Sequence, residues 1–229
     1  MYACIKDLIQ NMNLVIGCDV GCPYCYARNN ARRFHMVENF DVPEFFPGKL
    51  RRMDNPRPQN FLLTGMSDFA LWKPEWREAV FARMAANPQH QYLFLTKRPE
   101  RVHFSTPLEN AWFGVTVTRR AEISRIDALR ENIRGGRRHV TFEPMFDDVG
   151  EVDLRGVDWI VVGTETGRRR GKSVTRPEWA RSLTAQAHAQ NIPVFWKEDL
   201  APIMGAEGMV QELPEAFERV LEAQRAWKK

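Results

Sequence analysis

Three of the chain's four cysteines lie within eight residues of one another. They are Cys18, Cys22 and Cys25, with the spacing C-x3-C-x2-C. Three thiols cannot all pair as disulfides, and clustered cysteines in a reducing compartment are more often metal ligands. Cysteine thiolates hold [4Fe–4S] clusters, and three of them leave one iron without a protein ligand. The spacing therefore predicts an iron–sulfur cluster with one open coordination position.

Two alternatives compete with that prediction. A structural zinc site normally takes four protein ligands, and His35 is the nearest histidine that would complete the set. Chance clustering of the cysteines is the other alternative. Cys4 lies upstream of the expected first strand and is a poor candidate for a fourth ligand.

The segment from Cys18 to Cys25 resembles the signature loop of the radical S-adenosylmethionine (SAM) superfamily. In that family C-x3-C-x-aromatic-C follows the first strand of a partial (β/α) barrel, and here Tyr24 supplies the aromatic residue. The resemblance implies that the three cysteines bind three irons and that SAM chelates the fourth. It also implies an electron donor such as flavodoxin or ferredoxin, and reductive cleavage of SAM to a 5′-deoxyadenosyl radical that abstracts hydrogen from a substrate.

Other segments resemble a narrower group, the phage Gp37/Gp68-like proteins, also called domain of unknown function 5131 (DUF5131). Members of that group often have a wider first cysteine gap, whereas this chain has the gap usual for radical SAM proteins. The narrower resemblance implies no particular reaction. The matching segments are Leu93–Val102, Trp112–Val117, Thr141–Val149, Val157–Gly167 and Arg176–Glu198.

Seven short segments are expected to be the strands that position these residues. Each is rich in β-branched or aromatic residues. Most are apolar nearly throughout, which is typical of parallel strands covered on both faces. The expected strands are Met12–Ile16, Phe61–Thr64, Tyr92–Thr96, Trp112–Val117, His139–Glu143, Trp159–Gly163 and Pro193–Lys197.

Amphipathic segments between the strands predict helices. Lys73–Asn87 and Arg176–Asn191 carry a proline near the first turn, and Arg119–Ile133 has a similar apolar period. Seven β-then-α units in series predict a right-handed wind of parallel strands. We therefore expect an α/β fold, a partial or near-complete (β/α) TIM-type barrel.

The chain of 229 residues is 44% hydrophobic and 27% charged, which suits one domain spanning residues 1–229. Within it, we expect residues 39–58 to form a loop or insertion and residues 214–229 a C-terminal helix. The N-terminal segment lacks the apolar region of a signal peptide, and no apolar run approaches the roughly 18 residues of a membrane span. We expect a cytoplasmic protein with no membrane partner.

Ligands of βα folds bind at the carboxyl ends of the strands. Nearly every expected strand ends beside polar or ionisable residues, so we expect these to share one site with the cysteine loop. An ordinary β-turn is the alternative for the segment Thr64–Asp68. The superfamily resemblance suggests that the SAM-binding residues are Tyr24, Gly65, Ser67, Asp68, Lys97, Arg98, Thr116, Thr118 and Thr164.

Three further residues at strand ends, Glu143, Glu165 and Lys197, are the candidate catalytic groups. A carboxylate there can orient a substrate or move a proton after hydrogen abstraction. The alternative is that Glu143 and Lys197 form an ion pair across the barrel mouth.

The formal charge of +4 allows an anionic partner but does not require one. Arg168, Arg169, Arg170 and Lys172 follow the sixth expected strand and are candidates for binding nucleic acid or a phosphate-bearing substrate. A solvated surface loop is the alternative. These residues and the cysteines also suggest a second function class, a non-catalytic protein with zinc or an iron–sulfur cluster that binds nucleic acid.

Overall fold

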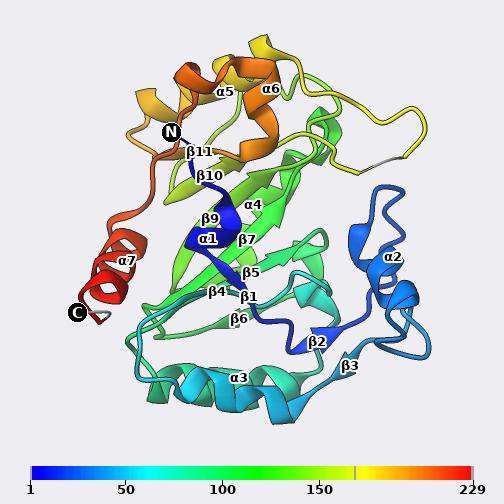
Figure 1. The fold of residues 1–229 in the computed structure, drawn as a ribbon, viewed down its shortest axis with the longest axis vertical. Helices are drawn as coiled ribbons and strands as arrows, with labels where there is room; N and C mark the ends of the chain where they lie inside the picture. Colours follow the sequence, from blue (N-terminus) through cyan, green and yellow to red (C-terminus); the bar gives the residue numbers. More distant parts are fainter. Residues whose placement is uncertain (1, 168, 228–229) are drawn as a thin grey trace.

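The computed structural model describes residues 2–167 and 169–227 (Figure 1). Its main element is a sheet of seven parallel strands that follow one another in chain order and curl into a half-barrel. The predicted α/β class and partial barrel are confirmed. From one edge of the sheet to the other, the strands are β1 (Gln10–Asn11), β4 (Asn60–Leu62), β5 (Gln91–Thr96), β7 (Ala111–Thr116), β9 (Arg137–Phe142), β10 (Trp159–Val162) and β11 (Val194–Trp196).

Three helices, α3 (Pro74–Ala86), α4 (Ser124–Asn132) and α5 (Pro177–Ala189), cover the outer face of the sheet. Pro74 and Pro177 begin their helices, where a missing backbone N–H costs nothing. Successive side chains of a strand point to opposite faces. One set of alternate residues therefore joins the outer core under these helices, and the other set faces the inside of the half-barrel.

The inner face is closed at the end where the strands begin. Trp112 and Trp159 lie there, and their rings are 4.5 and 5.2 Å from the ring of Phe217 in helix α7 (Glu215–Trp227). Helix α1 (Ile5–Leu8) packs against the same inner cluster. Figure 1 shows α7 and α2 on opposite sides of the sheet. Because the inner face is closed where the strands begin, a site on this face can lie only where the strands finish.

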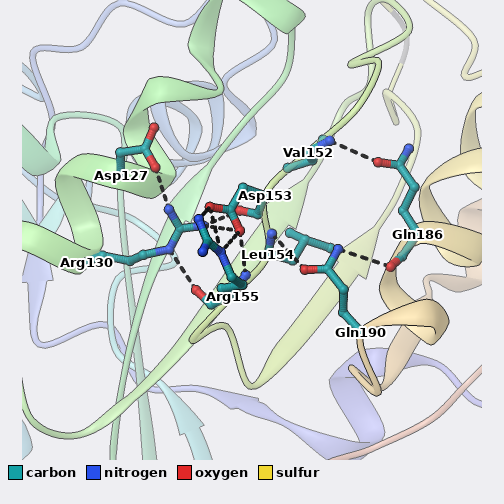
Figure 2. Close-up of polar contacts among 8 residues, drawn as sticks. All are labelled: Asp127, Arg130, Val152, Asp153, Leu154, Arg155, Gln186 and Gln190. Carbon is teal, nitrogen blue, oxygen red and sulfur yellow. Dashed lines mark hydrogen bonds and ion pairs between the residues drawn. The ribbon is translucent and has the colours of Figure 1, made fainter.

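The connection from β5 to β7 has only the 3-10 helix η3 (Pro99–Arg101), and the connection from β9 to β10 has no helix, so the prediction of seven βα units is wrong at both places. Val152 and Leu154 in the β9–β10 connection are buried in the outer core, where a helix would otherwise pack. Figure 2 shows how polar contacts tie the segment to its neighbours. Arg130 of α4 donates to the carbonyl of Arg155. Gln186 of α5 and Gln190, which caps this helix, accept the backbone N–H groups of Val152 and Leu154. Asp and Gly residues here favour turns over a helix.

The expected first strand, Met12–Ile16, is wrong in its extent: only Val15–Ile16 of it is a strand, and the strand of the main sheet, Gln10–Asn11, lies before it. β1 pairs with β4 in the main sheet, and β2 (Val15–Ile16) pairs antiparallel with β3 (Glu44–Phe45). Met12 and Leu14, between β1 and β2, are fully buried, which explains why the segment is largely apolar although it is not one strand. The cysteine loop therefore leaves from β2, beside the main sheet, and helix α2 (Tyr26–Arg33) follows it.

Short elements complete the fold. Residues 39–58 contain β3 and the 3-10 helix η1 (Pro47–Asp54), whose Met53 is buried in the outer core. Strands β6 (Phe104–Ser105) and β8 (Ile133–Arg134) pair with each other, and α6 (Ala201–Met204) follows β11. Within the described ranges, none of the helices has the length and apolarity to cross a membrane. The remaining 3-10 helices are η2 (Phe69–Leu71), η4 (Arg120–Glu122), η5 (Glu198–Leu200) and η6 (Ala206–Gly208).

Candidate functional site

The cysteine loop is held by backbone contacts where it leaves β2. Gly17 has a φ of 125°, and its N–H donates to the carbonyl of Met66 over 3.0 Å. The N–H of Cys18 donates to the carbonyl of Phe40 over 2.6 Å. A Cβ at position 17 would lie 2.7 Å from the Cα of Pro43, so only glycine fits this turn. The loop thus leaves β2 in a fixed direction.

Helix α2 begins directly after the third cysteine. Cys25 is its N-cap, and its Sγ accepts the N–H of Arg28 at 3.4 Å. The Arg28 guanidinium donates to the carbonyl of Cys18 and pairs with Asp41. One arginine therefore joins the two ends of the loop, and the amino-terminal end of the helix, which favours negative charge, lies at the cysteines.

All three cysteines of the loop are free thiols, and all three line one cavity of about 540 Å³. Burial raises the pKa of Cys18 to about 11, so its thiol is neutral at neutral pH. Across residues 2–167 and 169–227, no group of three or more His, Cys, Asp and Glu side chains is gathered to hold a metal ion. The chemistry of Cys18, Cys22 and Cys25 nevertheless fits an iron–sulfur cluster, since these residues are three soft donors from one loop that line one cavity.

The zinc alternative has less support from the geometry. His35 is exposed, with a φ of 48°, and does not line the cavity. The Sγ of Cys4 lies 3.1 Å from Glu198 Oε1, and Cys4 does not line the cavity either.

The cavity lies at the carboxyl ends of the main-sheet strands, as the strand-end rule predicts. Its polar wall comes from the ends of β4, β5, β7, β9, β10 and β11 and from the cysteine loop. Apolar residues of the inner face, including Leu93 and Trp159, form its lower part. The predicted site residues that line the cavity are Cys18, Cys22, Tyr24, Cys25, Gly65, Ser67, Asp68, Lys97, Thr116, Glu143, Thr164, Glu165 and Lys197.

Arg98 and Thr118 do not line the cavity. The Arg98 guanidinium pairs with Asp19 of the cysteine loop at 2.6 Å. The N–H and hydroxyl of Thr118 both donate to Glu122, over 2.7 and 2.9 Å. The side chains of Arg98 and Thr118 are thus bound by carboxylates of the protein itself.

Asp68 lines the cavity but is also used internally. Its carboxylate accepts hydrogen bonds from the Thr96 hydroxyl at 2.5 Å and from the N–H groups of Lys97 and Ala70. The hydroxyl of Ser67 accepts the indole N–H of Trp72 at 2.9 Å. These side chains fix the turn after β4 to the end of β5, in agreement with the turn alternative for this segment.

Gly65 presents its backbone to the cavity. Its carbonyl accepts the Tyr26 hydroxyl at 2.7 Å. A Cβ at this position would lie within 3 Å of the side-chain oxygens of Asn11 and Asn13, so a larger residue would displace them. Sequence reasoning missed Tyr26, although it directly follows the last cysteine.

Glu165 is almost completely buried, with 1% of its side chain exposed. Arg169 binds both of its oxygens, at 2.5 and 2.7 Å, and the N–H of Ser173 donates to it as well. The Arg169 guanidinium lowers the pKa of this carboxyl below its usual range. Glu165 therefore anchors the basic loop at the cavity. Arg170 and Lys172 of that loop are exposed, and Arg168 lies outside the described residues.

Glu143 and Lys197 form the ion pair that sequence analysis gave as the alternative to catalysis. Lys197 also lies 3.4 Å from Asp199, a cavity residue that the sequence prediction missed. Burial raises the pKa of Asp199 to about 6, and the nearby Glu143 adds to the effect. The neighbouring carboxylates raise the pKa of Lys197, although burial opposes them, so this lysine stays charged.

His139 also lines the cavity and was missed. Its side chain is directed to the inner face, as are those of Thr141 in β9 and Glu143 directly after it. Nε2 donates to the carbonyl of Phe94 at 3.0 Å, and burial lowers the pKa of His139 to about 4. In the sequence HVTFE, the polar residues His139, Thr141 and Glu143 alternate with apolar ones, and this pattern would have indicated that all three face the cavity.

A comparison with protein families matches residues 4–228 to the family described as a protein of unknown function, DUF5131. The chain belongs to this family. A search of curated proteins finds no match. Among solved structures, the DUF5131 chain is similar to a cysteine-to-alanine mutant of spore photoproduct lyase, with 11% identity and a TM-score of 0.49 over 85% of this chain and 74% of that one. The same mutant with a dinucleoside spore photoproduct has 11% identity and a TM-score of 0.46, over 95% and 72%.

Proposed function

We propose that this DUF5131 protein is a radical SAM enzyme, which cleaves SAM reductively with a [4Fe–4S] cluster and abstracts hydrogen from a substrate. The main observation in support is that the C-x3-C-x2-C loop shares one cavity with polar residues from six parallel strand ends. A non-catalytic metal protein has no need of such a cavity beside its cysteines.

The cluster-binding residues in this proposal are Cys18, Cys22 and Cys25. When bound, the cluster supplies the electron that breaks a carbon–sulfur bond of SAM. Gly17 and Gly21, with φ values of 125° and 76°, hold the bends that turn the cysteines toward the cavity. An electron donor such as flavodoxin or ferredoxin is the proposed partner, and the need for reduced thiols fits a cytoplasmic location.

The protein groups best placed to bind SAM are those that still have free polar atoms at the cavity. Lys97 lies with its ammonium 5.8 Å from the ring centroid of Tyr24 and forms no ion pair among the described residues, so it is available to a carboxylate. Thr116 offers a hydroxyl from β7, and Gly65 offers an approachable backbone. Asp68 and Ser67 instead position these groups through the turn after β4.

Glu143 and Lys197 lie on the wall formed by β9–β11, and we propose that this wall faces the substrate. The pair orients a polar group and holds a proton beside it. The apolar residues below, including Leu93 and Trp159, exclude water from the reacting atoms.

Metal content tests the cluster assignment. Protein reconstituted anaerobically with iron and sulfide should bind about four irons per chain in the wild type and Cys4→Ala, and much less in Cys22→Ala. Cys4→Ala is the matched control because Cys4 is also a partly buried free thiol but does not line the cavity. Addition of SAM should change the electron paramagnetic resonance spectrum of the reduced cluster.

Zinc in place of iron after aerobic and anaerobic preparation would contradict the proposal. So would equal loss of iron in Cys4→Ala and Cys22→Ala, because the site would then not be specific to the loop.

A further inference from the structure

The wall formed by the ends of β9, β10 and β11 contains more negative than positive charge. Glu143 and Lys197 meet across Gly163, whose missing side chain leaves room for them: a Cβ there would lie 3.0 Å from Glu143 and 3.2 Å from Lys197. Oδ2 of Asp199 lies 3.4 Å from the same ammonium group of Lys197. Two carboxylates therefore share one lysine.

These side chains are largely buried, with 25% of Glu143, 16% of Lys197 and 12% of Asp199 exposed. Lys197 contacts one oxygen of Glu143, and the other oxygen accepts no hydrogen bond from the described residues. An uncompensated carboxylate at a partly buried site is costly unless a cation or donor meets it. The second oxygen of Glu143 is open to the cavity, so the wall presents a carboxylate there and favours a further positive charge.

Glu165 shows how the same protein satisfies a carboxylate that it uses only internally. Arg169 takes both oxygens of Glu165, and the N–H of Ser173 gives a third bond. Asp199 accepts one backbone N–H, that of Thr164 at 3.2 Å, and it shares Lys197 with Glu143, so neither carboxylate has a cation of its own as Glu165 has. Of the other ionisable groups on this side, Glu198 adds negative charge next to Lys197, and Lys6 is exposed to solvent.

A second observation comes from His139, which is 1% exposed. Its imidazole crosses the face of Gly114 on β7 to donate from Nε2 to the carbonyl of Phe94 on β5. Because Nε2 carries the hydrogen, Nδ1 has a free lone pair, and it finds no partner among the described residues. His139 lines the same cavity and lies on the same side of β9 as Glu143.

We propose that this wall, Glu143, Lys197 and Asp199, binds a protonated amine of the substrate, with a further hydrogen-bond donor of that substrate directed toward His139. This inference rests on the proposed function, since it takes the cavity to be the enzyme's site. The two carboxylates accept the ammonium N–H groups, and Lys197, which pairs with both, offsets part of their mutual repulsion. A phosphate group would meet like charge here, so the substrate presents a cationic amine to the wall.

The test uses thermal unfolding of the full chain with three probes of matched size at equal ionic strength: n-butylamine, n-butanol and butyrate. A ligand that binds the folded state raises Tm. We expect n-butylamine to raise Tm by about 2 °C or more in the wild type and in Glu215→Gln, while the other probes do not. Glu215 is an exposed acid on α7 and serves as the matched control.

Glu143→Gln and Asp199→Asn should each lose most of the amine-dependent shift. Circular dichroism shows whether each variant is folded, and either folded variant suffices. An equal shift with n-butanol in the wild type, or an undiminished amine shift in a folded variant, would overturn the proposal.

A second arm separates substrate from SAM, whose own ammonium group is chemically similar. The amine shift should persist when SAM is present at saturating concentration, and its disappearance would overturn the assignment to a substrate. Because the readings with n-butylamine, n-butanol and butyrate need neither a cluster nor catalysis, the amine site and the radical SAM function can fail separately.

Discussion

Among single residues, Asp199 gives the clearest dependence on pH. Its pKa in the folded protein is raised to about 6 from the ordinary value of 3.8, chiefly by burial. An acid with a raised pKa binds more protons in the folded state, so its contribution to stability is full below about pH 4 and is lost as pH rises through about 6.

We therefore expect the free energy of unfolding of the wild type, relative to Asp199→Asn, to fall by roughly 2–3 kcal/mol between about pH 4 and pH 7. Urea unfolding at a series of pH values measures this difference. The difference would stay constant if Lys197 held Asp199 ionised throughout, and a flat profile would contradict the account.

The candidate residues at the strand ends could be located from sequence, and so could the pairing of Glu143 with Lys197, but the partners Arg169 and Asp199 could not. The order of apolar segments placed Glu143, Glu165 and Lys197 at one rim. That Glu165 is bound by Arg169 depends on how a loop folds back, and Asp199 takes part only because η5 turns directly after β11. Such contacts depend on tertiary structure rather than on local pattern.

Among the elements, β7 and β9 are fitted to each other by a glycine. Gly114 pairs with His139 in the sheet, and a Cβ at position 114 would lie 2.4 Å from His139 Nε2. We expect Gly114→Ala to destabilise the fold by about 1–3 kcal/mol, because the imidazole must leave its bond to Phe94. Urea unfolding measures the loss. Gly208→Ala, where a Cβ would meet nothing within 4 Å, is the control, and equal losses in both would contradict the fit.

The basic loop after β10 is held to the cavity by one carboxylate. We expect Glu165→Gln to speed trypsin cleavage after Arg169 about fivefold, because the loss of about 1 kcal/mol raises the population of the released loop. Mass spectrometry of timed digests measures the rate. Glu178→Gln, an exposed acid at the start of α5, should digest like the wild type. Unchanged cleavage in Glu165→Gln would show that the carboxylate does not anchor the loop.

Element type was largely predictable, and the exceptions have local causes. Every main-sheet strand except β1 lies within two residues of its expected limits, because apolar runs between polar helices give a strong pattern. The pattern predicts one strand over Met12–Ile16 because residues buried in an irregular connection look the same in sequence. It predicts a helical unit between β9 and β10, but buried residues of this connection, such as Val152 and Leu154, pack without a helix.

For the whole molecule, α7 is the part that closes the half-barrel opposite the cavity. Phe217 is fully buried against Trp112 and Trp159. We expect Phe217→Ala to cost about 3–5 kcal/mol and to change the tryptophan fluorescence of the folded state. Urea unfolding followed by fluorescence measures both. Phe34→Ala, at a 62% exposed phenylalanine, should change stability little, and a small effect of Phe217→Ala would contradict the role of α7.

The central claim is that the loop and the cavity together cleave SAM, and the most direct measurement is the yield of 5′-deoxyadenosine. Anaerobically reconstituted wild-type protein, reduced with dithionite in the presence of SAM, should form 5′-deoxyadenosine, and so should Cys4→Ala. Cys18→Ala, Cys22→Ala and Cys25→Ala should form none above the background without protein. A wild-type protein that carries its full iron–sulfur cluster and still yields no 5′-deoxyadenosine would contradict the account.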